Sequence, residues 1–317
     1  MIPWIFLTPS LAGVAVFHGI PFLDVVRRSF QDVMGVRFLG LANYRAVWGN
    51  GAFRLAAVNT FRFLAVCIPT LLTVSLGLAL LLTAVSRGTG RAPSRGDCGQ
   101  KSQGFWHQKT TGQASCLGGN GRDGAVRTTM VLPMAVPAAS MVLIWKIFLC
   151  PEGVLNQVLA AVTGEPWSVD WAFSGYAFPV LVLTYLWKHT GYDMILWAAG
   201  LAGIPEEYYE AARMDGAGVW ARLRYITFPQ LGGTFRLVGI LSVVNSFRVY
   251  REAYLLAGSY PDSSIYLIPH LFAHWFLNLD VQKMTAAAVM MTAVFLAQAS
   301  LLWLWGRRRR REGRGSV

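Results

Sequence analysis

Six long apolar blocks constrain this chain more than any other feature of its sequence. They cover residues 2–23, 63–85, 130–149, 176–201, 237–256 and 286–305. Each approaches or exceeds the roughly 20 residues that an α-helix needs to cross a bilayer, and a helix satisfies its own backbone hydrogen bonds in lipid. Six such blocks argue against the buried helices of a large soluble protein. They predict an all-α integral membrane protein with about six transmembrane helices.

The distribution of positive charge predicts how these helices are oriented. The chain has a net charge of +12, although only 14% of its residues are charged. With both termini in the cytoplasm, seven, four and six Lys or Arg residues lie in the inner segments 86–127, 203–236 and 306–317. Five, none and one lie in the outer loops 24–58, 151–174 and 257–284. This asymmetry follows the positive-inside rule, so the basic excess reflects membrane topology and predicts no nucleic-acid partner.

The first apolar block lacks such a basic inner flank. It begins at residue 2 with no preceding Lys or Arg, while Arg27 and Arg28 lie on its predicted outer side. Taken alone, this block favours the reverse orientation. A true N-terminus that lies upstream and carries a basic leader explains the mismatch. A cleaved signal peptide explains it less well, because a charged leading region and a clear cleavage site are both missing.

The segment 88–125 differs in composition from the rest of the chain. It is rich in Gly, Ser, Arg, Gln and Thr, and it shows no helical periodicity. Such a composition is typical of a disordered cytoplasmic loop; an inserted or out-of-frame stretch is the other interpretation. Cys98, His107 and Cys116 lie here, but their spacing matches no tight zinc pattern. We therefore predict no metal site and assign no role to the four cysteines.

The segment 204–229 is a polar island between two apolar blocks. Pro205 suits the first position of a helix, and the two glutamates after it favour the first turn. Gly216 can end that helix in a left-handed conformation, and a second helical stretch at 219–226 is followed by Pro229. An amphipathic hairpin resting on lipid is the alternative, but an acidic first helix is unsuited to an anionic leaflet. A partner in the cytoplasm is the better explanation.

A gapped motif runs through this polar island. Glu-Ala-Ala is followed by three residues and Gly, and then by nine residues and Ile-Thr-Phe-Pro. The motif resembles the signature of the permease subunits of binding-protein-dependent ABC importers, which have Leu where this chain has Phe228. In that family the loop forms a coupling helix that docks on a cytoplasmic ATPase subunit. The resemblance implies an ATPase-coupling role for Glu210, Ala211, Ala212, Asp215, Gly216, Ile226 and Pro229.

Other parts of the chain resemble the carbohydrate-uptake branch of these permeases, the relatives of the maltose and glycerol-phosphate permeases. The matching residues are Pro21-Phe22, Ser29-Phe30, Asn43-Tyr44, Asn59-Thr60, Leu132-Pro133, Pro137, Trp187-Lys188 and the run 196–207. The resemblance implies the MetI-like fold as a single permease domain over 1–317, with its core at 59–306 and its coupling loop at 204–230. Segment 88–125 matches nothing in the family, in which the loop between spans two and three is short.

The resemblance implies the transmembrane subunit of an ATP-driven importer in the bacterial cytoplasmic (inner) membrane. An external binding protein would deliver a sugar or sugar-like solute. Two separate ATPase subunits would bind ATP and Mg, and a second homologous permease would complete the path through the bilayer. The chain itself would have no catalytic residue and no cofactor, in keeping with the lack of a phosphate-binding loop in its sequence. Gating would be a rigid-body motion of helical bundles.

Polar groups inside spans are costly and usually functional. An aromatic face combined with hydrogen-bonding side chains suits a sugar, so several polar and aromatic residues of spans four and five are candidates for the substrate path. Mutual salt bridges, Lys188 with Asp193 and Glu252 with a nearby arginine, are the alternative for the charged members. The candidates are Tyr185, Trp187, Lys188, Asp193, Asn245, Arg248 and Tyr250.

Three other functions remain as alternatives. A permease for a non-sugar solute fits the same motif. An autonomous secondary transporter predicts inverted repeats or unwound spans with central carboxylates, and it leaves the Glu-Ala-Ala motif without a task. A membrane-embedded enzyme needs a catalytic constellation, and neither HExxH nor GxSxG occurs in the sequence.

Overall fold

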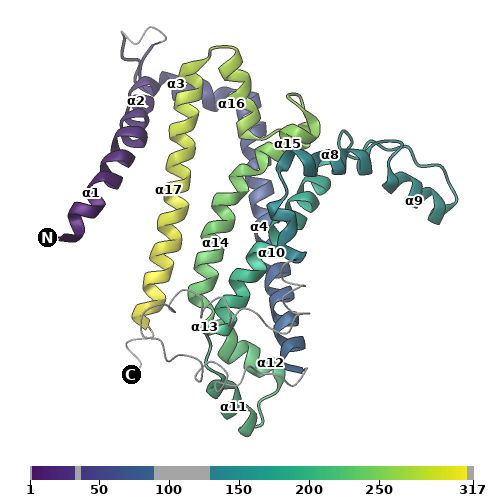
Figure 1. Cartoon of the computed structure of the whole chain (residues 1–317). Coiled ribbons are helices and arrows are strands. Elements are labelled where there is room, and N and C mark those ends of the chain that lie inside the picture. Colours follow the sequence, from purple (N-terminus) through teal and green to yellow (C-terminus); the bar gives the residue numbers. More distant parts are fainter. Residues whose placement is uncertain (1, 33–36, 89–128, 313–317) are drawn as a thin grey trace. The chain divides into compact units, whose positions relative to one another are not determined.

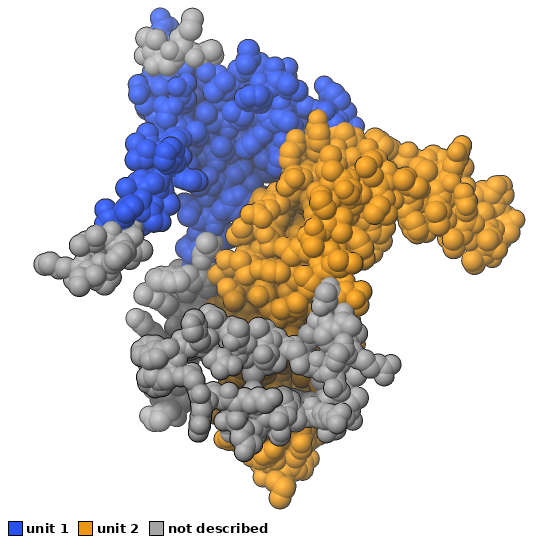
Figure 2. Space-filling model, in the orientation of Figure 1, with its two compact units in different colours: residues 1–61, 259–317 blue, residues 62–258 orange. Residues whose placement is uncertain are grey.

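The computed structural model describes residues 2–32, 37–88 and 129–312 (Figure 1). The described residues are almost entirely helical, and their only β-type pairing is an isolated bridge between Gln31 and Phe38. The chain forms two compact units, shown in different colours in Figure 2. Unit 1 comprises Met1–Phe61 and Ser259–Val317, and unit 2 comprises Arg62–Gly258. The interpretations of 88–125 fall, from residue 89 on, outside the described residues, and the single permease domain stays a prediction.

The predicted all-α membrane fold is confirmed, since all six apolar blocks are mainly helical where the structure describes them. By length and composition, four stretches of the described residues can cross a bilayer: Thr8–Ser29, Gly51–Ala84, Ala138–Thr163 and Val281–Gln298. The fourth and fifth predicted spans are also helical. They are α10 (Ala177–Ala202) and the succession of α14 (Gly232–Ser246), η3 (Phe247–Val249) and α15 (Tyr250–Ala257).

The third predicted span is interrupted before Pro137. A helix over 129–135 stops before Pro137, and α8 (Ala138–Leu149) begins directly after it. A turn then separates α8 from α9 (Val154–Thr163). Pro137 has no N–H to continue a helical ladder, which explains the first break. The predicted span 130–149 therefore corresponds to the 129–135 helix and α8, while α9 is a separate short helix.

A π-helical turn precedes Pro21 in the first span. Helix α1 (Ile2–Val14) continues through η1 (Ala15–Gly19) into α2 (Ile20–Ser29), where the N–H of Ile20 donates to the carbonyl of Ala15. Pro21 comes next and cannot donate. A wide turn of this kind is one way in which a helix absorbs a proline. The continuous helix ends at Ser29, six residues beyond the predicted end of the first span at residue 23.

Unit 1 packs α3 (Ala42–Gly49), the start of α4 (Gly51–Gly88), α16 (Ile268–Leu277) and α17 (Val281–Glu312). Its core includes Phe53 and Trp275, whose rings stack with centroids 6.5 Å apart. Asn59 on α4 donates to the carbonyls of Ser263 (2.6 Å) and Tyr266 (3.0 Å). These bonds hold the loop that contains η4 (Ser263–Ile265) against α4.

Unit 2 packs the rest of α4 with α10 and α14 around Trp197. The indole N–H of Trp197 donates to Ser75 Oγ on α4 at 3.1 Å. Two glycines of α10 allow close approach: a Cβ at Gly191 would overlap the carbonyl oxygen of Met130, and one at Gly200 would overlap Thr234 Oγ1. Helix α10 is thus the central element of this unit. The predicted coupling loop follows it directly, and four of the predicted substrate-path residues lie on it.

Candidate functional site

The polar island after α10 folds as a helix, a glycine turn and a second helical segment. Helix α11 (Glu206–Met214) has Pro205 as its N-cap, so it starts one position after the predicted first helical residue, Pro205. Gly216 has φ +73°, as predicted for a left-handed terminator. The N–H of Ala217 donates to the carbonyl of Ala212 (2.8 Å), and that of Gly216 to the carbonyl of Arg213 (3.1 Å). These two bonds form a Schellman motif, which ends α11 sharply.

The second helical segment runs further than the sequence predicted. It consists of α12 (Val219–Arg222), the π turn η2 (Leu223–Thr227) and α13 (Phe228–Gln230). Pro229 therefore lies inside the helical segment, and the prediction that it follows the helix is wrong. The N–H of Phe228 donates to the carbonyl of Leu223, and this wide turn accommodates the proline just as η1 does near the N-terminus.

Buried side chains hold the two arms of this loop together and pack it against the rest of unit 2. Tyr209 is 6% exposed, and its hydroxyl lies 3.0 Å from Thr227 Oγ1, so the two helical arms of the loop are linked. Ile226 packs against the same core cluster. Sequence reasoning missed Tyr209 and Thr227. Their only signal is that Tyr208 and Tyr209 are adjacent on a helix and must point in different directions.

The other face of the loop is open. Glu210, Ala211, Asp215, Gly216 and Pro229 are exposed, whereas Ala212 and Ile226 are half-buried. Large apolar side chains share this exposure: Met214, Val219, Trp220 and Tyr225 are each at least 75% exposed. We call these four residues the exposed ridge. Large exposed apolar side chains on a polar loop are typical of a surface that binds a partner.

The second candidate site is a polar face of α10. Tyr185, His189 and Asp193 recur every four residues, so they share one face of the helix, and all three are buried. The rings of Tyr185 and His189 stack with centroids 4.0 Å apart. Asp193 accepts from Ser242 Oγ on α14 at 2.8 Å. The Tyr185 hydroxyl is buried and has no hydrogen-bond partner within the part of the chain that the structure describes.

An ion pair joins α10 to α15. Lys188 Nζ lies 2.6 Å from Glu252 Oε1, with side chains that are 12% and 7% exposed. Pairing of Lys188 with Asp193, one of the predicted alternatives, is therefore wrong. Five residues along an α-helix are about 140° apart, so these two side chains leave the helix in different directions. The second oxygen of Glu252 is buried without a hydrogen-bond partner among the described residues.

The remaining candidates for the substrate path are spread out. Trp187 is half-exposed and packs edge-on against Trp145, with centroids 5.8 Å apart. Tyr250 lies against Tyr254 at 5.5 Å. Asn245 is half-buried and Arg248 is exposed, and the side chain of neither forms a hydrogen bond in the described ranges. The structure thus pairs two of the seven candidates with other residues, Lys188 with Glu252 and Asp193 with Ser242. It does not bring all seven candidates together in one site. Among the described residues no group of three His, Cys, Asp or Glu side chains could hold a metal ion.

The chain shares a family with known transport proteins. The family model described as "Binding-protein-dependent transport system inner membrane component" matches residues 117–309. The chain belongs to this family of multi-pass membrane permeases.

Its relatives cover almost the whole chain. The lactose transport system permease protein LacF of Rhizobium radiobacter is 24% identical over 97% of this chain and 94% of its own length. The trehalose/maltose transport system permease protein MalF of Thermococcus litoralis is 26% identical over 98% and 94%. The diacetylchitobiose uptake system permease protein NgcF of Streptomyces coelicolor is 28% identical over 95% and 81%.

A solved structure has the same fold. It belongs to a bacterial ABC transporter involved in the import of the acidic polysaccharide alginate. The TM-score is 0.72 at 19% sequence identity, and the match covers 98% of this chain and 95% of the other. At this identity the likeness concerns the fold. Together with the family match, this likeness confirms the predicted permease fold.

Proposed function

We propose that this chain is the transmembrane subunit of an ATP-driven importer that takes up a sugar or sugar-like solute. The single observation that carries the proposal is the coupling loop: the Glu-Ala-Ala motif lies on a short helix that ends in a Schellman motif, beside the exposed ridge. A loop of this form is rigid where it is anchored and open where a partner binds.

The partners of this loop are separate ATPase subunits on the cytoplasmic side, with ATP and Mg. Exposed Glu210, Ala211 and Asp215 would contact the ATPase groove, since small side chains permit close approach and carboxylates can accept hydrogen bonds. Half-buried Ile226 instead anchors the loop to its own core. Both chain termini lie in the cytoplasm in this proposal, as the distribution of Lys and Arg favours.

The substrate class is inferred from the relatives, whose names include lactose, trehalose/maltose and diacetylchitobiose transport. A related solved assembly contains a periplasmic protein that binds an alginate pentasaccharide. An external binding protein would likewise deliver the solute here, and a second homologous permease would complete the path. Polar, half-buried Asn245 and the aromatic rings of Trp187 and Tyr250 suit contacts with a sugar.

The test is uptake of labelled disaccharides into liposomes that contain the assembled transporter. We expect uptake only when the binding protein, both ATPase subunits and internal ATP are all present. Competition among unlabelled sugars, amino acids and peptides then defines the solute class. Uptake that persists without the ATPase subunits would contradict the proposal and favour a secondary transporter.

A further inference from the structure

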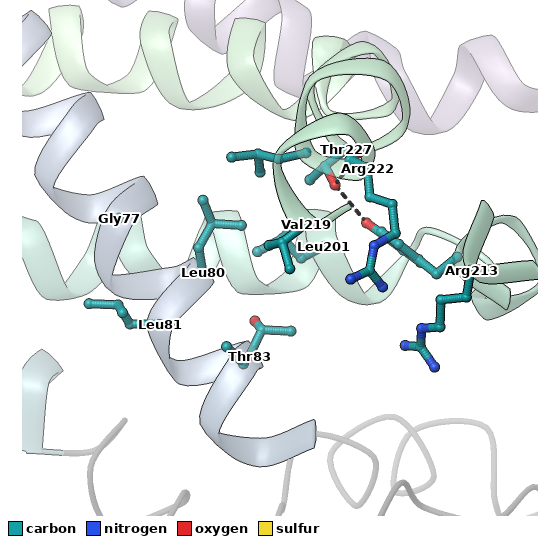
Figure 3. A pocket seen from close by; sticks show the side chains of 12 residues that line it. Gly77, Leu80, Leu81, Thr83, Leu201, Arg213, Val219, Arg222 and Thr227 are labelled. Carbon is teal, nitrogen blue, oxygen red and sulfur yellow. Dashed lines mark hydrogen bonds between the residues drawn. The ribbon is translucent and has the colours of Figure 1, made fainter. Parts of the chain in front are cut away.

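An apolar pocket of about 600 Å³ lies in unit 2 beside the coupling loop (Figure 3). Helix α4 forms one wall, through Gly77, Leu81 and neighbouring residues, and Val219 and Leu223 of the loop lie across from it. The volume falls within the range of small-molecule pockets. The pocket lies between the spanning helix α4 and the coupling loop. The proposed transport cycle does not use this pocket.

The α4 wall has space for an apolar group. A Cβ added at Gly77 would meet no atom within 4 Å, so this position opens directly into the pocket. Leu81 is 64% exposed despite lying among apolar neighbours. An apolar surface of this kind is stabilised when a hydrocarbon group covers it.

Two arginines line the opposite side of the same pocket. Figure 3 shows Arg213 and Arg222 on the side away from Leu81 and Thr83 of α4. Arg213 is paired with Glu206 at 3.2 Å, but both side chains are about half-exposed, and such a pair is easily exchanged for another anion. The Nε of Arg222 is buried and has no hydrogen-bond partner within the described ranges. A buried charged donor without an acceptor is costly, and an anionic oxygen would satisfy it.

Apolar walls and two cations in one pocket match an anionic lipid. Basic pockets between spanning helices on the cytoplasmic side bind anionic headgroups, and the pocket opens beside a helix that is long and apolar enough to cross the bilayer. We infer that this pocket binds an anionic phospholipid, with one acyl chain against α4 and the phosphate at Arg222 and Arg213. The lipid would connect α4 to the coupling loop. This inference goes beyond the proposed function and depends on it only for the cytoplasmic position of the loop.

The test is native mass spectrometry of the assembled transporter titrated with phosphatidylglycerol, and with phosphatidylcholine of the same acyl chains. We expect the double variant Arg213→Gln, Arg222→Gln to bind phosphatidylglycerol about tenfold more weakly, because charge-assisted hydrogen bonds are lost. Its binding of phosphatidylcholine should weaken less, because the choline cation already balances the charge of that phosphate. The matched control is Arg28→Gln, which removes an exposed arginine of unit 1 and should leave the affinity for phosphatidylglycerol as in the wild type.

A second variant tests the apolar part of the pocket. Gly77→Phe places a ring in the acyl-chain position and should also weaken phosphatidylglycerol binding about tenfold. Gly239→Phe is its control, because a Cβ at Gly239 likewise meets nothing within 4 Å and Gly239 does not line the pocket. If the variants fail to assemble, a photoactivatable phosphatidylglycerol on the wild-type transporter should label peptides that contain 77–84 or 219–227.

Three results would overturn the inference. Both pocket variants could bind phosphatidylglycerol as the wild type does. Inorganic phosphate could compete as strongly as the lipid, which would indicate a headgroup site without a chain site. The photoactivatable lipid could label only other parts of the chain. These readouts record lipid binding and not transport, so they can be told apart from a failure of the proposed function.

Discussion

Gly191 is the glycine of α10 that lies against another stretch of backbone. A Cβ there would overlap both the carbonyl oxygen and the carbonyl carbon of Met130. Backbone atoms cannot move aside as the end of a flexible side chain can. The position therefore requires glycine, for reasons of space and not of backbone conformation.

We expect Gly191→Ala to destabilise the protein by about 1–3 kcal/mol or more, the usual range for overpacking. The matched control is Gly239→Ala, at a helical glycine where a Cβ meets nothing within 4 Å. Because alanine has the higher helix propensity, the control should be neutral or slightly stabilising. Thermal unfolding of the purified proteins in detergent measures both. Equal unfolding temperatures for the two variants would contradict the close packing of Met130 on α10.

Lys188 and Glu252 form a buried pair whose members depend on each other. Removing one partner leaves the other charge buried and uncompensated, which costs about 3–5 kcal/mol. We expect Lys188→Met or Glu252→Gln alone to lower the unfolding temperature clearly. The double variant should recover most of the loss, because no buried charge is left unpaired. Additive losses in this double-mutant cycle would show that the two side chains do not interact.

The same pair shows how far sequence reasoning reaches at the level of residues. The sequence singled out the polar residues of spans four and five, because they are expensive in lipid. It could not pair them correctly, since the partner of Lys188 is 64 positions away on another helix. The register between α10 and α15 is set by packing, and no local pattern in the sequence encodes it.

At the scale of elements, helix starts and stops were the most predictable features. Gly216 and the two glutamates after Pro205 have strong local preferences, so helix α11 and its left-handed terminator could be predicted from sequence. Pro229 misled the prediction, because the π turn before it lets the helix continue. Tyr209 was missed for a different reason: its role depends on Thr227, which lies 18 residues away.

Helix α16 gives a prediction about pH. His270 is buried at its N-terminus, and its Nδ1 accepts the backbone N–H of Leu267 at 3.2 Å. Burial, together with the nearby His274, lowers the pKa of His270 from 6.5 to about 4. In the folded state His270 thus binds a proton more weakly than in the unfolded state, so stability is lost as the pH falls from about 6.5 toward 4. It is fully present above pH 6.5.

Thermal unfolding measured between pH 7.5 and pH 5 tests this prediction. The wild-type unfolding temperature should fall on acidification. In His270→Gln it should be lower at pH 7.5, because the buried imidazole is lost, but should change less with pH. If both proteins show the same pH dependence, other groups are responsible and the neutral state assigned to His270 is wrong.

For the whole molecule, the sequence predicted the class of protein and left its cargo open. Six apolar blocks and the gapped motif suffice for an all-α permease, because bilayer thickness and glycine conformation are local constraints. The division into two compact units could not be predicted, since unit 1 joins segments from both ends of the chain. Unit 2 holds both the coupling loop and the polar face of α10. The proposed coupling loop and the proposed substrate-path residues thus belong to one compact unit.

The most direct test of coupling compares two glycines of the same loop. Gly216 has φ +73°, whereas Gly218 has φ −65° and ψ 168°, a conformation that any residue adopts. A Cβ meets nothing within 4 Å at either position. Alanine therefore costs about 1–2 kcal/mol at Gly216 alone, from the left-handed conformation. The measurement is ATP-driven sugar uptake, together with ATPase activity stimulated by the binding protein, in liposomes with the assembled transporter.

We predict that Gly216→Ala lowers both rates about fivefold or more. A penalty of about 1–2 kcal/mol lowers the ratio of the native loop conformation to its alternatives by roughly 5- to 30-fold. Gly218→Ala should stay within about twofold of the wild type. Equal rates for the two variants, whether both unchanged or both reduced, would contradict the claim that the conformation of this loop couples ATP hydrolysis to transport.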